Sequence, residues 1–153
     1  MDNLNPPVRL LAGFHNAFPG QTPAFIVNVP GREMWVAAAS TDWNDYTLHA
    51  PDLEGRTRFS LRSAKFKQTV LKRPLPRWAY FPAGVILALT ADGLDVSGVS
   101  AVIVGDETHG IRYEYALGMT VAALWHTILE RPYNESDLTD IVERVRRDYV
   151  QGK

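Results

Sequence analysis

The chain has 153 residues, of which 46% are hydrophobic and 22% are charged, so it can bury a core and is not expected to be disordered. Its net charge of −1 argues against a nucleic-acid binder, and the lack of cysteine excludes a disulfide framework, a thiol nucleophile and a cysteine-ligated zinc. No apolar run reaches the roughly 18 residues of a membrane span, and no secretory signal opens the chain, so a cytoplasmic protein without a membrane partner is expected.

The first half of the chain predicts one helix followed by four short strands. The helix is expected to begin after Asn5-Pro6-Pro7, to carry Leu11, Phe14 and Phe18 as its apolar stripe, and to end at Pro19-Gly20. The strands are expected at residues 24–29, 34–39, 46–50 and 57–61, each bounded by turn-forming residues. Alternating apolar and polar side chains in the last two strands favour an antiparallel sheet with one face toward water.

A basic connection, residues 63–76, joins the strands to the second half of the chain. Two interpretations of its charge remain open: a solvated linker, or a charged patch that meets a partner. The cations in and beside it are Arg62, Lys65, Lys67, Lys72, Arg73 and Arg77.

The second half predicts helices around one buried strand. A helix over residues 78–89 is followed by an apolar strand at 98–104, a polar loop at 105–110, and a helix with Leu117, Val121, Leu124 and Ile128 on one face. Asn134 is expected to cap a final helix together with Asp137, and Glu143 and Arg147 are spaced to form an ion pair on it. Strands first and helices later indicate a single α+β domain over residues 1–153, with two layers, a mixed or antiparallel sheet, and helices on one face.

The loop between the buried strand and the next helix is the main candidate site. A helix that opens just after a strand offers backbone N–H groups and a positive dipole end to an anion such as phosphate. The weak anion loop predicted here consists of Thr108, His109, Gly110, Ile111 and Arg112. Bulky side chains and the acid Glu114 follow Gly110, where phosphate-binding loops normally carry small residues, so the affinity for phosphate is expected to be low.

Polar side chains in and after this loop suggest two further hypotheses. Asp106, Glu107, His109 and Glu114 are of the right types for a metal or acid–base cluster. Alternatively, they form a polar loop in which Asp106 caps the following turn. No two histidines are spaced four apart on a helix, and no catalytic or metal-binding residue is assigned.

The order of these segments resembles the N-terminal half of a GHMP-type small-molecule kinase, and galactokinase in particular. The helix that begins Trp78-Ala79-Tyr80-Phe81-Pro82-Ala83-Gly84-Val85 is similar to the family's Trp-x-x-Tyr-x-x-Gly-Val helix. The run from Val99 to Asp106 resembles the strand that leads into the family's phosphate loop. The resemblance covers nearly the whole chain and implies a fold related to ATP- and Mg-dependent sugar kinases, whose C-terminal domain is not represented here.

The family's sugar motif is incomplete in this chain. Val29-Pro30-Gly31-Arg32 resembles its start, but Glu33-Met34 follows at once. Either Thr41-Asp42-Trp43 stands for the motif's Thr-Asp-Tyr, or the whole hairpin is deleted, which is the preferred alignment. The resemblance therefore offers only Arg32 and Asp42 as weak sugar-binding candidates, without the motif's Glu-His pair.

The family's phosphate motif, Pro-x-Gly-x-Gly-Leu-Ser-Ser-Ser-Ala, aligns with residues 108–117. Only its first glycine is kept, as Gly110, and the serines fall on Glu114, Tyr115 and Ala116. We therefore expect kinase ancestry without independent kinase activity. The alternatives are a binding, regulatory or oligomerisation module, and one half of a split kinase.

A partner chain is expected on the same basis, as a homo-oligomer or a complex with a different protein. The predicted contact is formed by Tyr113, Tyr115 and the helix that carries Trp125, because a lone half of such a kinase would expose apolar surface. A small-molecule ligand is also considered, and nucleic acid is not expected.

Overall fold

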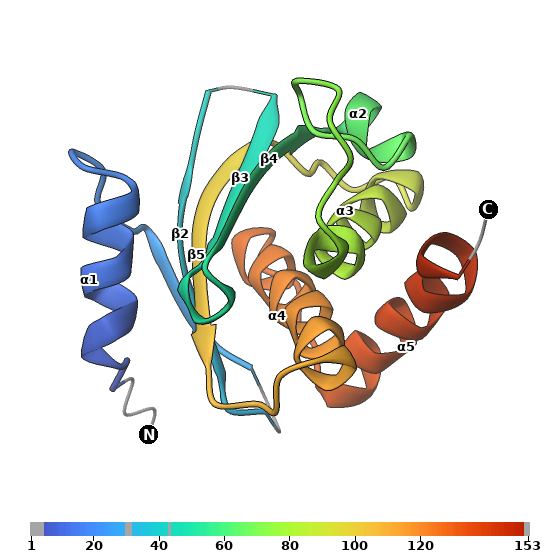
Figure 1. Ribbon diagram of the computed structural model, residues 1–153. Coiled ribbons are helices and arrows are strands. Elements are labelled where there is room, and N and C mark those ends of the chain that lie inside the picture. Colours follow the sequence, from blue (N-terminus) through green and yellow to red (C-terminus); the bar gives the residue numbers. More distant parts are fainter. Residues whose placement is uncertain (1–4, 30–31, 43, 152–153) are drawn as a thin grey trace.

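Five strands form one mixed sheet in the computed structural model, which describes residues 5–29, 32–42 and 44–151 (Figure 1). The order across the sheet is β1-β2-β5-β3-β4, and only β3 and β5 run parallel. The strands are β1 (Phe25–Asn28), β2 (Met34–Ser40), β3 (Asp45–Ala50), β4 (Gly55–Ser60) and β5 (Val99–Gly105). The predicted residues Pro30, Gly31 and Trp43 lie outside the described part of the chain.

Helices account for most of the remaining chain. The longer ones are α1 (Val8–Ala17), α3 (Tyr80–Ala91), α4 (Ile111–Ile128) and α5 (Glu135–Val145). The short ones are η1 (Pro51–Leu53), α2 (Leu61–Lys65), η2 (Arg77–Ala79) and the π-helical turn η3 (Arg146–Val150), which continues α5. The predicted α+β domain with a mixed sheet is confirmed.

The helices cover both faces of the sheet rather than one. Helices α3, α4 and α5 lie on one face, whereas α1 packs alone on the other (Figure 1). The central strand explains why: Ala101 and Ile103 of β5 point into the large core under α4, and Val102 and Val104 point into a small core under α1. Every residue of β5 is buried, and Ser100 is its one polar side chain, which is the composition of a strand covered on both faces.

Helix α1 is rotated relative to the prediction. Leu10 and Phe14 are buried against the sheet, whereas Leu11 is 41% exposed. Leu10 and Leu11 both satisfy a three-to-four residue spacing with Phe14, so periodicity alone did not distinguish them. The helix uses the Leu10 face because Ala37 and Val102 provide the matching apolar surface on the sheet.

The end of the chain confirms the predicted cap and corrects the predicted ion pair. The Asn134 side chain accepts a hydrogen bond of 2.9 Å from the Asp137 N–H, and the Asp137 carboxylate accepts one of 3.0 Å from the Asn134 N–H. Glu143 pairs with Arg146 at 2.6 Å rather than with Arg147, which pairs with Asp148. Helix α5 passes into the π-helical turn at Arg146, so a spacing of four no longer places residue 147 over Glu143.

Candidate functional site

The candidate loop starts where β5 passes the beginning of β2. A side chain at Gly105 would place its Cβ 2.2 Å from the Met34 sulfur and 2.5 Å from the Glu33 carbonyl oxygen. The Asp106 N–H donates a hydrogen bond of 2.8 Å to that carbonyl. Glycine is therefore required at 105 by the close approach of the chain's own backbone.

Asp52 of η1 holds the same end of β5 from the opposite side. Its carboxylate accepts hydrogen bonds from the Gly105 N–H at 2.9 Å and from the Tyr113 hydroxyl at 2.6 Å, and it also binds Arg9 of α1. Arg9 continues to the Gly105 carbonyl at 3.1 Å and to Asp106 at 3.0 Å. We call Arg9, Asp52, Asp106 and Tyr113 the Asp52 cluster; it joins α1, η1, the loop and α4.

Tyr113 occupies the space under the start of α4. Its ring is fully buried, and the exposed His109 ring meets its edge with a centroid distance of 5.0 Å. Burial, followed by the hydrogen bond to Asp52, raises the pKa of Tyr113 well above the usual value for tyrosine. The phenol therefore remains protonated and donates to Asp52 over the whole physiological pH range.

The cations near the loop are already engaged by carboxylates of the chain. Arg32 lies 3.6 Å from Glu107 and over the Tyr115 ring, and Arg77 lies 3.9 Å from Glu114. Arg112 is exposed, and the described residues provide no ion pair for it. Arg112 is thus the loop cation that an incoming anion could reach without displacing an acid.

All five residues of the predicted anion loop lie together at the surface. Thr108, His109, Gly110, Ile111 and Arg112 are exposed, and Ile111 is 77% exposed although it is apolar. Gly110, with φ of 104°, precedes the first turn of α4, and within the described chain no side chain caps that turn. Asp106 was a candidate for such a cap, but its carboxylate binds Arg9 instead.

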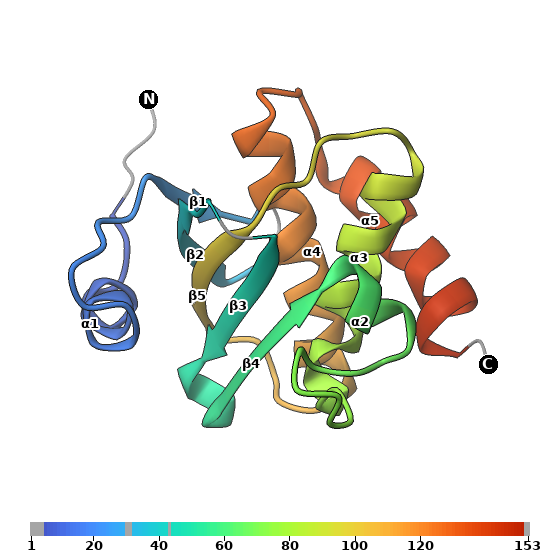
Figure 2. The ribbon, with the colours of Figure 1, turned by 90° about the horizontal axis from the view of Figure 1, so that it is seen from above.

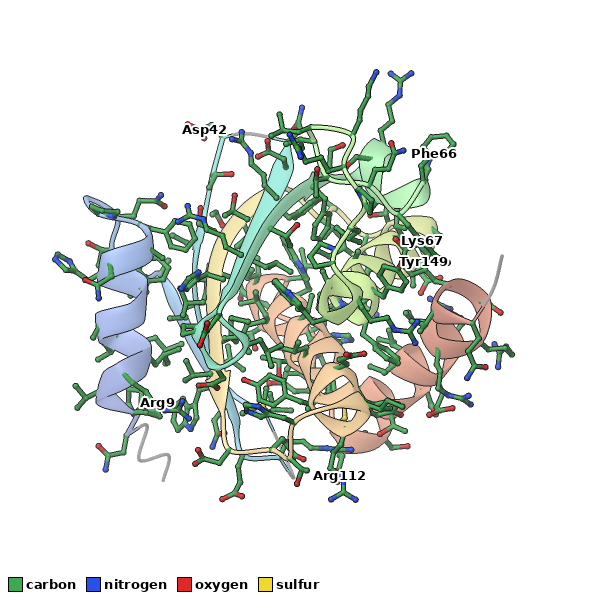
Figure 3. All side chains as sticks on the ribbon, in the orientation of Figure 1. Arg9, Asp42, Phe66, Lys67, Arg112 and Tyr149 are labelled. Atoms are coloured by element: carbon green, nitrogen blue, oxygen red, sulfur yellow. The ribbon has the colours of Figure 1, made fainter. Side chains whose placement is uncertain are left out.

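The two sugar-binding candidates lie apart. Arg32 precedes β2 and reaches the loop, whereas Asp42 follows β2, so the seven-residue strand separates them by roughly 20 Å at about 3.3 Å per residue. Figure 3 shows Asp42 and Arg112 at opposite ends of the molecule. Of the two candidates, Arg32 is the one that lies near the loop.

Sequence reasoning missed Arg9, Asp52 and Glu33, which organise the loop. Asp52 lies between two predicted strands and Arg9 lies at the start of the predicted first helix, and neither was singled out. Arg9 binds Asp52 across 43 residues of sequence and Asp106 across 97. A single sequence carries no signal for such pairs. An acid in a turn near a buried strand could nevertheless have been considered as an acceptor for the backbone N–H groups at the end of that strand.

The residues present do not fit a nucleotide triphosphate and its metal. The loop carries the acids Asp106 and Glu107, and Glu114 follows in the first turn of α4. Three nearby cations, Arg9, Arg32 and Arg77, are paired with these acids, whereas Arg112 is exposed. These acids would repel phosphate oxygens, and bulky side chains at positions 111, 113 and 115 follow Gly110, where a phosphate-binding loop carries small residues. In the described ranges, no three His, Asp or Glu side chains are grouped closely enough to hold a metal ion.

Comparison with solved structures places this arrangement in a known fold. No protein-family model matches the sequence, and no curated protein does. The structure is similar to the galactokinase of Lactococcus lactis solved with galactose, with a TM-score of 0.70 and 14% identity over 94% of this chain and 42% of that one. It is also similar to the mevalonate kinase of Methanococcus jannaschii, with a TM-score of 0.61 and 11% identity over 88% of this chain and 49% of that one.

A third similar structure is the D-glycero-D-manno-heptose 1-phosphate kinase of Bacteroides thetaiotaomicron, with a TM-score of 0.54 and 12% identity over 75% and 36% of the two chains. The chain therefore has the fold of the N-terminal half of GHMP-type kinases and spans less than half the length of these neighbours. The predicted resemblance to galactokinase is confirmed at the level of the fold.

The predicted contact surface on α4 is wrong in its main residues. Trp125 is 1% exposed and Tyr113 is 0% exposed, because both are part of the chain's own core. Tyr115 is partly buried against Phe81 and donates a hydrogen bond of 2.8 Å to Glu143. Trp125 and Tyr113 are therefore not accessible as the main contacts of a partner. In the described part of the chain, no helix is both long and apolar enough to cross a membrane.

Proposed function

We propose that this protein is a galactokinase-like member of the GHMP kinase fold that does not phosphorylate a sugar by itself and acts by binding another protein chain. The observation that carries the proposal is the internal pairing at the loop: Asp52 and Asp106 bind Arg9, and Glu107 binds Arg32. A phosphate group that binds Arg9 or Arg32 would have to displace these carboxylates. Phosphoryl transfer depends on positioned phosphates, so no catalytic step is assigned to these residues.

A coupled assay of ADP release with ATP, Mg²⁺ and galactose tests the lack of activity. We expect no galactose-dependent turnover above the background of ATP alone, with an active galactokinase as the positive control. Turnover that requires galactose and disappears in Arg32→Ala or Arg112→Ala protein would overturn this part of the proposal.

The binding role is supported by the length of the similar structures. The galactokinase aligns over 42% of its own length, so more than half of that protein lies outside the matched part. We propose that a second copy or a different chain contacts this one. Light scattering at micromolar concentration and co-purification of partners test it: a single-chain mass with no partner retained would contradict the role.

The same coverage favours a second candidate, one half of a split sugar kinase. It predicts that sugar-dependent turnover appears only when a separate chain with the other half of the fold is added. Mixing the two purified chains and repeating the coupled assay decides between the candidates. The cytoplasmic location and the lack of a nucleic-acid or membrane partner remain predictions in either case.

A further inference from the structure

The segment at residues 62–77, called here the basic segment, is the strongest charge concentration in the chain. It carries six positive side chains and no acid, whereas the whole chain has a net charge of −1. Within the described residues, no ion pair is formed by Arg62, Lys65, Lys72 or Arg73. A set of unpaired cations on one surface attracts acidic partners and speeds their encounter.

The basic segment is ordered rather than a loose linker. Helix α2 begins with a capping box in which the Ser60 hydroxyl accepts from the Ser63 N–H at 3.0 Å and the Ser63 hydroxyl accepts from the Ser60 N–H at 2.9 Å. After it, Gln68 and Pro74 form a bridge that closes a turn, and the Thr69 N–H donates to the Arg73 carbonyl at 2.8 Å. The segment stands out beside α2 at the edge of the molecule (Figures 1 and 2).

Two side chains anchor the segment to the rest of the domain. Leu75 is buried in the core. The Lys67 ammonium lies 5.4 Å from the centre of the Tyr80 ring and 5.1 Å from that of Tyr149, and Figure 3 shows it directed toward Tyr149. Lys67 and Lys72 also have positive φ, an uncommon backbone conformation for residues other than glycine. The turn is therefore fixed in shape.

The fixed turn presents apolar side chains to solvent. Phe66 is 70% exposed and Leu71 is 76% exposed, and Val70 beside them is 37% exposed. Figure 3 shows Phe66 directed away from the body of the molecule. Exposed apolar side chains on an ordered segment, surrounded by cations, are characteristic of a protein-binding surface with an apolar centre and a charged rim.

A concave surface with a volume of about 550 Å³ lies beside Phe66 and Val70. Phe66 and Val70 provide its apolar wall, and Arg62 and Lys72 provide cations at its rim. A concavity of this kind accepts a protruding side chain of a peptide. The flat surface of a bilayer has no such side chain to fill it. Its lining consists of Ser60, Arg62, Ser63, Phe66, Gln68, Thr69, Val70 and Lys72.

We propose that the basic segment is a docking surface for an acidic segment of another protein, which inserts one bulky apolar side chain beside Phe66 and Val70. This inference rests on the proposed binding role and specifies its surface and the chemistry of the partner. It does not depend on the predicted lack of kinase activity, since the concave surface beside Phe66 lies apart from Arg112 of the candidate loop (Figure 3).

A fluorescein-labelled peptide of glutamates around one central tryptophan is the probe, and fluorescence anisotropy is the measurement. We expect saturable binding that weakens as salt is raised, and that weakens about tenfold when the peptide's tryptophan is replaced by serine. Phe66→Ser and Leu71→Ser should each weaken it by about tenfold as well, and the double variant Lys65→Glu, Lys72→Glu should weaken it further.

Matched controls separate this surface from general effects. Val8→Ser removes an apolar side chain that is 83% exposed on α1, and Arg131→Glu reverses a charge between α4 and α5; neither should change binding. All of these side chains are exposed, so each variant should unfold at the wild-type temperature.

Three results would overturn the proposal. One is peptide binding that is unaffected by the peptide's tryptophan or by Phe66→Ser. Another is binding to phosphatidylserine vesicles, single-stranded RNA or ATP in place of the peptide. The third is a wild-type dimer that Phe66→Ser and Leu71→Ser convert to single chains, because a second copy then occupies the surface. If peptide binding fails while a dimer persists in both variants, the docking surface is refuted and the proposed binding role stands.

Discussion

The Tyr113 hydroxyl donates a hydrogen bond of 2.6 Å to the Asp52 carboxylate, across 61 residues of sequence. The bond fastens the first turn of α4 to the turn between β3 and β4. Asp52 is also the acceptor for the Gly105 N–H at the end of β5. Three elements that sequence reasoning treated separately are therefore held by one carboxylate.

Replacing Tyr113 with phenylalanine should lower the free energy of unfolding by roughly 1 to 3 kcal/mol, since a buried hydrogen bond to a charged group is lost. Urea unfolding of the variant and the wild type measures the difference. Tyr133→Phe is the matched control, because among the described residues the Tyr133 hydroxyl makes only a long contact of 3.5 Å with the Thr127 hydroxyl. An equal effect of the two substitutions would contradict the assigned role of Asp52.

Alanine at position 105 should destabilise the protein by about 1 to 3 kcal/mol or more, because its Cβ would overlap the Met34 side chain and the Glu33 carbonyl. Gly13→Ala in α1 is the contrasting control: its Cβ would lie no closer than 3.4 Å to other atoms, and alanine favours a helix interior by up to about 1 kcal/mol. The unfolding temperature should therefore fall for Gly105→Ala and rise for Gly13→Ala. A neutral Gly105→Ala variant would show that the strand end can shift.

Acidification should destabilise the protein through His49. Burial, and then the neighbouring Arg56, lower the pKa of His49 in the folded state. The unfolded chain then binds more protons than the folded chain once the pH falls below about 6.5, so stability is lost as the pH falls through that value and is constant above it. The buried His49 Nδ1 also has no hydrogen-bond partner among the described residues.

Urea unfolding of wild type and His49→Gln between pH 7.5 and 5.5 isolates this effect. The variant should show a flatter dependence on pH than the wild type. If the free energy of unfolding depends on pH equally in the two proteins, the loss of stability at low pH is caused by other titrating groups.

Inorganic phosphate at high concentration should bind weakly at residues 107–113, where Arg112 and the N–H groups at the start of α4 are accessible. Amide shifts in a phosphate titration report it, and ATP should shift the same amides poorly or not at all. One exposed ion pair contributes only ~0.2–1 kcal/mol, so Arg112→Ala should weaken the binding of phosphate by at most about fivefold. Arg131→Ala is the control, and micromolar ATP binding centred on the loop would refute the prediction.

Local sequence signals predicted much of the fold. The capping box at Asn134 and the alternation in β4 depend on neighbours within four residues, and the structure has both. The buried face of α1 was predicted wrongly because two helix faces had equal apolar spacing. The choice between them depends on Ala37 and Val102, which are distant in sequence.

The candidate site was predictable in position but not in its contacts. The strand–loop–helix pattern located residues 108–112 correctly at the surface. The carboxylates that neutralise Arg9 and Arg32 come from η1 and from the loop itself, and their pairing depends on the assembled sheet. The exposed Phe66 and Leu71 were overlooked because an apolar residue in a basic stretch gives no indication of which way it points.

The position of β5 in the sheet has a consequence for assembly. The β1–β2 and β3–β4 hairpins form from neighbouring residues, but they touch each other only through β5, which is the last strand in the chain. Until residues 99–105 insert, each hairpin exposes an unpaired inner edge to other chains. Insertion also brings together segments more than 50 residues apart, so it should be the slow step of folding and the stage most prone to aggregation.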